Sequence, residues 1–171
     1  HVYRGRLDFA EAKRRVDTIY VPYHRTLSAL TNEVLNKVGQ VLLVDCHSMP
    51  ASAAHHVIPA HETVDVVLGD RFGASCREDV TDLVEDLFRD QGFRVIRNKP
   101  YAGGFITQNH GAPMRGRHAL QIEVNRALYM NEVTLTKTAD FGALQGALTA
   151  IVARLLAELE TRLAPQQLAA E

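Results

Sequence analysis

The sequence has few cysteines, almost no net charge and no long apolar run, and each of these absences excludes a class of protein or partner. Only Cys46 and Cys76 are present among 171 residues, which excludes a disulfide framework and favours a reducing cytoplasm. The formal net charge of −1 gives no electrostatic reason to expect a nucleic acid or an anionic membrane as partner. No apolar run approaches the ~20 residues of a transmembrane helix, and no signal peptide is visible.

What is present describes an ordinary globular chain. Apolar residues make up 46% and charged residues 23% of the sequence, and the length suits one domain, residues 1–171, with a sizeable core. The chain begins at His1 without an initiator methionine. We therefore expect a piece of a longer domain, whose functional site has parts outside this chain.

Helical and strand patterns alternate along the chain and predict an α/β fold with a sheet covered by helices on both faces. Asp8 is an N-cap signal for a helix over 9–38, which Pro22 should split or kink near Tyr20. Ser75–Glu78 has the pattern of a capping box for a second helix. The remaining predicted elements are strands at 41–47, 64–69, 93–98 and 119–125, a long functional loop at 99–116, and a final helix capped by Asp140.

The first strand is the most informative element. Its four aliphatic residues, 41–44, predict a strand buried on both faces in the middle of a parallel sheet. The run ends at Asp45 and His47, where open α/β sheets place their ligands. His47 is therefore a candidate metal ligand, although a hydrogen-bonded polar residue at a strand end is an equal alternative.

The fourth strand carries a second candidate. Alternation places Gln121, Glu123 and Asn125 on one face, which indicates either a cavity beside that face or an edge strand with a solvated face. In the first case Glu123 is a candidate general base. Both alternatives are open on the sequence alone.

Two arginines and one loop are candidates for binding a small acidic substrate. Arg71 lies in a tight loop after the second strand and Arg126 follows the fourth, and guanidinium groups suit carboxylates, although surface ion pairs are the commoner role. Tyr101 and Gly104 belong to a loop that could close over a ligand. His55, His56 and His61 are interpreted as solvent-exposed, and His24 as a packing or hydrogen-bonding residue. Cys46 cannot form a nucleophile–base pair with His47, because neighbouring residues of a strand point to opposite faces.

Four ordered motifs carry a family resemblance: Asp45-Cys-His-Ser-Met-Pro50, Val67-Leu-Gly-Asp-Arg-Phe-Gly73, Asn98-Lys-Pro-Tyr-Ala-Gly-Gly104 and His118-Ala-Leu-Gln-Ile-Glu-Val-Asn-Arg126. Together they resemble the N-formylglutamate amidohydrolase family over nearly the whole chain. The resemblance implies a mixed, mainly parallel sheet like that of the zinc carboxypeptidases (phosphorylase/hydrolase-like). It also implies hydrolysis of N-formyl-L-glutamate to formate and glutamate during histidine degradation in the cytoplasm.

The resemblance also implies roles for particular residues. His47 matches a ligand of a divalent metal, expected to be zinc, and Glu123 matches the general base. Arg71 and Arg126 match positions for the carboxylates of the substrate. The family's two other metal ligands precede the part that this chain matches, so we expect this chain to bind metal weakly and to turn over slowly or not at all.

Two other functions fit the same residues. One is a metallo-amidase that acts on another N-acyl amino acid, and the other is a non-catalytic remnant that binds a ligand or a partner subunit. Neither the metal nor the oligomeric state follows from the sequence, and a homo-oligomer stays open.

Overall fold

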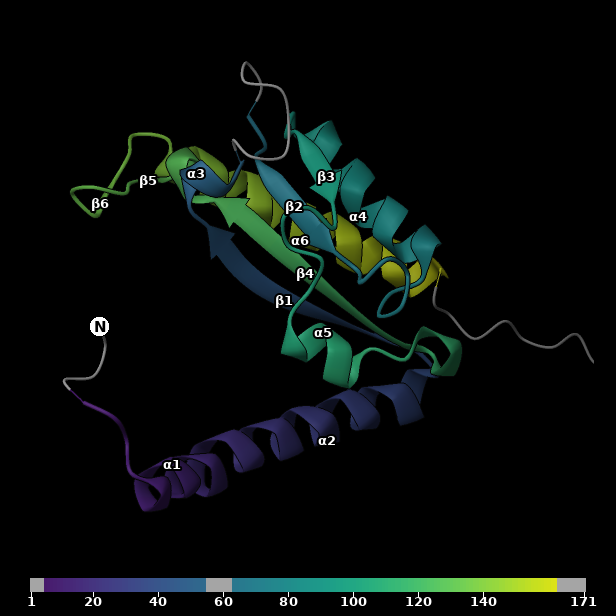
Figure 1. Ribbon diagram of the computed structural model, residues 1–171. Coiled ribbons are helices and arrows are strands. Elements are labelled where there is room, and N and C mark those ends of the chain that lie inside the picture. The colour runs from purple at the N-terminus through teal and green to yellow at the C-terminus, as the bar shows by residue number, and fades with distance from the viewer. Residues whose placement is uncertain (1–4, 55–62, 163–171) are drawn as a thin grey trace, which may run out of the picture.

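The computed structural model describes residues 5–54 and 63–162, and its first part is a helical arm (Figure 1). The arm consists of α1 (Phe9–Arg15), a π-helical turn (Val16–Tyr20) and α2 (Val21–Val38). The predicted break near Tyr20 is confirmed, because the π-helical turn ends just before Pro22, which has no backbone N–H to donate. Gly39 ends the arm in the left-handed conformation, with φ of +83°.

The sheet has four strands in the order β1-β4-β2-β3. They are β1 (Val41–Met49), β2 (Val66–Gly69), β3 (Val95–Arg97) and β4 (Arg117–Asn125). β1 is parallel to β4 and β2 is parallel to β3, whereas β2 and β4 run antiparallel. The expected α/β class with a mixed, mainly parallel sheet is confirmed.

The predicted place of β1 in that sheet is wrong. Within the described residues β1 pairs only with β4 and forms the edge, and its residues Leu42–Val44 are half-buried. The central strand is β4, in which Gln121 and Glu123 are both buried. The alternative of a solvated edge strand at 119–125 is therefore also wrong. Apolar composition shows that a strand is buried somewhere, but it does not determine which strands pair with it.

Two helices cover one face of the sheet, α4 (Glu78–Asp90) and α6 (Phe141–Arg162). The predicted capping box of α4 is wrong, because the N-cap is Arg77 and no side chain caps the helix. Ser75 is bound to the sheet instead: its carbonyl accepts a hydrogen bond from the backbone N–H of Ala119 at 2.8 Å. The core joins both helices to the sheet through buried apolar side chains that include Val66, Leu68, Val84, Leu87, Phe88, Leu120, Ile151 and Leu155.

The remaining elements are short. α3 (Ala51–Ala54) follows β1, and α5 (Phe105–His110) occupies part of the stretch predicted as a long loop. Single 3-10 turns lie at Pro113–Arg115 and Arg126–Leu128, and β5 (Met130–Asn131) pairs with β6 (Thr136–Lys137). The predicted histidine-rich segment 55–62 lies outside the described residues.

In the part of the chain that the structure describes, one helix is long and apolar enough to be compared with a membrane span. Residues Phe141–Leu159 of α6 have a mean hydropathy of 1.3, which satisfies the length and composition of a bilayer-crossing helix. A core helix of a soluble protein meets the same criteria, and α6 packs Leu144, Ile151 and Leu155 into the core. The single match is therefore weak evidence for a membrane span.

Candidate functional site

The site begins with the pairing of β1 and β4. The register places His47 directly opposite Glu123, and His47 Nδ1 lies 3.9 Å from Glu123 Oε1. Directly opposed residues on neighbouring strands project from the same face of a sheet. The two candidate residues, which the sequence indicates separately, therefore converge on one face of the sheet.

Asp45 joins them from the same face of β1. Its Oδ2 atom lies 3.1 Å from His47 Nε2, yet that oxygen is buried and has no hydrogen-bond partner of acceptable geometry among the described residues. The imidazole thus lies between two carboxylates, with 47% of its own side chain exposed to solvent. Two carboxylates and a solvent-accessible imidazole therefore lie together on this face of the sheet.

Glu123 has the properties of a base held away from water. Burial raises the pKa of Glu123, while His47, the hydrogen bond from Gln121 and Arg126 lower it, and Asp45 raises it. Gln121 Nε2 donates to Glu123 Oε1 at 2.8 Å, and Gln121 Oε1 accepts from the backbone N–H of Gly104 at 2.7 Å. A backbone N–H can only donate, so the amide of Gln121 must turn its oxygen to Gly104 and its NH₂ group to Glu123.

The predicted loop lies beside this carboxylate. The N–H of Gly104 is engaged by Gln121, so this donor is already satisfied. The side chain of Tyr101 packs against the small apolar cluster of Met49, Val64 and Val67. The loop is therefore linked to Glu123 through Gln121, while the substrate-binding role expected for Tyr101 and Gly104 stays a prediction.

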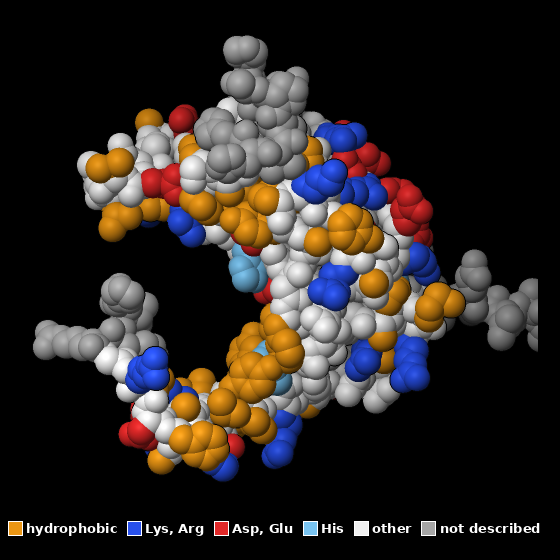
Figure 2. All heavy atoms as spheres, in the orientation of Figure 1, with side chains coloured by type: hydrophobic (Ala, Val, Ile, Leu, Met, Phe, Trp, Pro, Cys, Tyr) orange, Lys and Arg blue, Asp and Glu red, His pale blue; other side chains and the backbone are white. Residues whose placement is uncertain are grey.

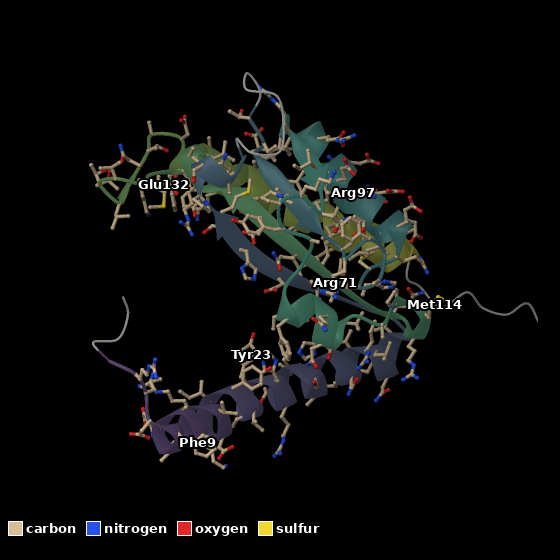
Figure 3. All side chains as sticks on the ribbon, viewed as in Figure 1. Phe9, Tyr23, Arg71, Arg97, Met114 and Glu132 are labelled. Carbon is tan, nitrogen blue, oxygen red and sulfur yellow. The ribbon has the colours of Figure 1, made fainter. Side chains whose placement is uncertain are left out.

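Arg71 is attached to the same loop and has no partner for its charge. Its backbone N–H donates to the carbonyl of Ala102 at 2.8 Å, and a Cβ atom on Gly103 would lie 3.1 Å from Arg71 Cγ. The half-buried guanidinium has no hydrogen bond or ion pair with any described residue. Figure 3 marks its position near α5. An unpaired, half-buried guanidinium is suited to binding an anionic ligand.

Arg126, in contrast, has partners within the protein. Its Nε donates to Ser48 Oγ at 3.1 Å, its Nη2 donates to the Ser48 carbonyl at 3.3 Å, and Nη1 lies 3.7 Å from Glu132 Oε1. Glu132 also accepts the backbone N–H of Ala51 in α3 at 3.0 Å, and Figure 3 shows it beside that helix. Arg126 thus supports the end of β1 next to His47, and contact with a substrate carboxylate stays a prediction.

The described residues do not make a complete metal centre. They include no group of three or more His, Cys, Asp and Glu side chains that could hold a metal ion. The buried, unpartnered Oδ2 of Asp45 beside His47 Nε2 provides at most two donors, whereas catalytic zinc takes three protein ligands.

Other histidines lie apart from this arrangement, and a mostly apolar cavity reaches the end of β1 from the helix-covered face of the sheet. His24 Nδ1 lies 3.3 Å from His110 Nε2, and this stacked pair joins α2 to α5, in agreement with the packing role predicted for His24. His118 Nδ1 accepts the backbone N–H of Arg77. A cavity of about 880 Å³ lies between α6 and the face of the sheet that carries Ile122 and Val124. Its lining is mostly apolar, but Cys46, His47 and Ser48 line it at the end of β1.

The face of the sheet near β1 borders an open hollow. Figure 2 shows this hollow between the helical arm and the rest of the molecule, with hydrophobic side chains gathered along the arm. The exposed large hydrophobic residues of the arm include Phe9, Ile19, Tyr23 and Leu30. The site is therefore accessible from the side of the hollow.

Sequence reasoning missed two residues of this site. Gln121 was placed on the correct face of β4, but its alternating position gave no sign of a bond to both Gly104 and Glu123. Asn98 was quoted only as part of a motif, yet its amide binds the loop that carries Arg71. An asparagine at the end of a strand, two residues before Pro100, was the one available signal for a turn.

Comparisons with known proteins agree with one another. The sequence profile of the N-formylglutamate amidohydrolase family matches residues 1–130. N-formylglutamate deformylases of Pseudomonas putida and Pseudomonas aeruginosa are 31% and 30% identical to this chain over 123 residues. The crystal structure of N-formylglutamate amidohydrolase from Ralstonia eutropha JMP134 matches with a TM-score of 0.84 and 36% identity, covering 93% of this chain.

These relatives are longer than this chain. The matched regions cover 45% and 46% of the two deformylases and 57% of the Ralstonia eutropha chain. The chain thus spans about half the length of the relatives that it matches.

Proposed function

The chain belongs to the N-formylglutamate amidohydrolase family, and on this basis we propose that the protein hydrolyses the formyl amide of N-formyl-L-glutamate to formate and L-glutamate. The observation that carries the proposal is the pairing of His47 with Glu123 on one face of the sheet, where His47 Nδ1 lies 3.9 Å from Glu123 Oε1. The raised pKa of Glu123 supports it, because a buried carboxylate is a stronger base than an exposed one.

Glu123 would move the protons of the reaction. It takes a proton from the attacking water as the oxygen of that water bonds to the formyl carbon. It then passes the proton to the amide nitrogen as the C–N bond breaks, which releases formate and the amino group of glutamate. Gln121 holds one oxygen of this carboxylate at 2.8 Å, so the other oxygen is the one available to the water.

Arg71 would bind a carboxylate of the substrate. Its guanidinium has no ion pair within the described part of the chain, and its loop touches the segment whose Gly104 N–H reaches Gln121. A substrate held there is fixed relative to Glu123, which converts the encounter of substrate and base into an intramolecular step. Arg126 is proposed to act nearby, by supporting Ser48 and His47 or by meeting a second carboxylate.

His47 is proposed as one ligand of a divalent metal, with zinc as the expected ion because imidazole suits it. Asp45 Oδ2 could supply a second donor, and the remaining ligands would have to come from outside the described residues. The proton transfers above are assigned to Glu123 alone. The proposal includes a cytoplasmic setting and histidine degradation as the source of the substrate. It requires no nucleic acid or membrane.

The test measures turnover and binding on the same protein. Formate release from N-formyl-L-glutamate is followed with and without added zinc. Release of L-glutamate from N-acetyl- and N-succinyl-L-glutamate is measured in parallel and distinguishes a related amidase. Binding of each compound is measured by calorimetry. We expect the formyl compound to bind best, and Arg71→Met to weaken its binding by about tenfold, the scale of one charge-assisted hydrogen bond. Equal binding to Arg71→Met contradicts the role of Arg71.

Glu123→Gln distinguishes catalysis from binding alone. A second function, ligand binding without catalysis, is favoured by the lack of a three-ligand group in residues 5–54 and 63–162. If the protein is an enzyme, Glu123→Gln abolishes formate release and leaves calorimetric binding almost unchanged. If no turnover occurs in either protein under any metal condition while binding persists, the binding function replaces the enzymatic one.

A further inference from the structure

The turn that carries Arg71 adopts a backbone conformation that its residues disfavour. Arg71 and Phe72 have φ angles of +55° and +56°, although neither is a glycine. Left-handed conformations are disfavoured for residues other than glycine and persist only where the surroundings enforce them. Two such residues in succession therefore require contacts from outside the turn that hold them in this conformation.

Asn98 provides that explanation. It follows β3, and its own φ of +60° is in the left-handed region, which asparagine tolerates better than most residues. Its Oδ1 accepts the backbone N–H groups of Asp70 at 3.2 Å and Phe72 at 3.4 Å, on either side of Arg71. Its Nδ2 donates to Asp70 Oδ1 at 2.8 Å, so the whole amide group is bound to the turn.

Asp70 completes the clamp. It is 4% exposed, and its Oδ1 also accepts the backbone N–H of Gly73 at 3.2 Å, at the far end of the turn. The backbone N–H of Arg71 itself donates to Ala102. The backbone is thus held before, at and after Arg71, while the guanidinium is left without a partner among the described residues.

We propose that Asn98, acting with Asp70, is a positioning residue that holds the turn 70–73 in its strained form and thereby presents the Arg71 guanidinium to a carboxylate of the substrate. This inference rests on the proposed function, since it assigns the anion that Arg71 receives. Asn98 does not touch the substrate and acts only through the backbone on both sides of Arg71.

The test compares Asn98, which binds a turn distant in the sequence, with an asparagine whose side chain binds its own local turn. Asn131 Oδ1 accepts the backbone N–H groups of Val133 and Thr134 at 2.9 and 3.0 Å, in the β5–β6 hairpin. Asn98→Gly removes the clamp but suits a positive φ, so it should preserve the fold, and Asn131→Gly is the matched control. Calorimetry with N-formyl-L-glutamate should show about tenfold weaker binding for Asn98→Gly and no change for Asn131→Gly.

A double-mutant cycle separates positioning from a general structural effect. In the Arg71→Met background, Asn98→Gly should weaken binding no further, because the group that it positions is gone. Additive losses would refute the inference. If Arg71→Met alone leaves binding intact, the proposed role of Arg71 fails; if Arg71→Met weakens binding and Asn98→Gly does not, only the positioning role fails.

A measurement without ligand keeps the inference testable on its own. The NMR order parameter of the Arg71 Nε–H bond should fall in Asn98→Gly and stay constant in Asn131→Gly. Asn98→Asp, which loses the Nδ2 donor beside the Asp70 carboxylate, is a second variant and should show the same fall. An unchanged order parameter in both Asn98 variants would overturn the inference, whatever the binding data show.

Discussion

Gly69, the last residue of β2, is the position at which a single methyl group should disturb the site most directly. A Cβ atom at Gly69 would lie 2.7 Å from the backbone nitrogen of Gly103 and 2.8 Å from the carbonyl carbon of Ala102. Both atoms belong to the backbone, so no side-chain rotation relieves the overlap. The loop must move away from β2, and with it the acceptor of the Arg71 N–H at 2.8 Å.

The size of the effect follows from overpacking. Inserting a methyl group into a close-packed position costs about 1–3 kcal/mol. For a chain of this length each kcal/mol lowers the melting temperature by roughly 2–4 °C. We therefore expect Gly69→Ala to lower the melting temperature by about 2–12 °C, measured by circular dichroism, and to weaken binding of N-formyl-L-glutamate.

The same substitution at Gly146 provides a control of opposite sign. Gly146 lies inside α6, and a Cβ atom there meets nothing within 4 Å. Replacing a glycine in a helix by alanine stabilises it by about 0.5–1 kcal/mol, so Gly146→Ala should raise the melting temperature. If Gly69→Ala has the melting temperature of the wild-type protein, or if both variants lower the melting temperature equally, the close approach of the loop to β2 is not a feature of the protein in solution.

Three further predictions concern charge and packing. The pKa of Glu123 is raised by burial, so the folded state holds its proton to higher pH than the unfolded chain and stability falls as pH rises between the two pKa values. Glu123→Gln should thus melt higher than wild type at pH 7 and not at pH 4. Burial and then His24 lower the pKa of His110, so stability should fall as pH drops below about 6.5. His24→Gln should make melting temperature less dependent on pH in that range, and an unchanged dependence would contradict the His24–His110 coupling. Leu155→Ala should cost about 2–5 kcal/mol in urea titrations, since Leu155 is buried in the core; a loss below 1 kcal/mol would be too small for a core position.

The sequence by itself determined which residues carry chemistry and on which face of a strand they lie. Alternation along 119–125 placed Glu123 with Gln121, because successive side chains of any strand point to opposite faces. The change from aliphatic to polar residues along the first strand identified His47, and this change is likewise a local feature of the sequence. The break before Pro22 and the stop at Gly39 were equally readable, because they depend on the covalent structure of single residues.

Only the tertiary structure decided which of these residues meet. The opposition of His47 and Glu123 depends on the pairing of β1 with β4, whose residues are far apart in the chain. The edge position of β1 and the clamp of Asn98 on Asp70, 28 residues away, depend on the order of the strands in the same way. Strand order is set by the packing of the whole core, and no local pattern of residues encodes it.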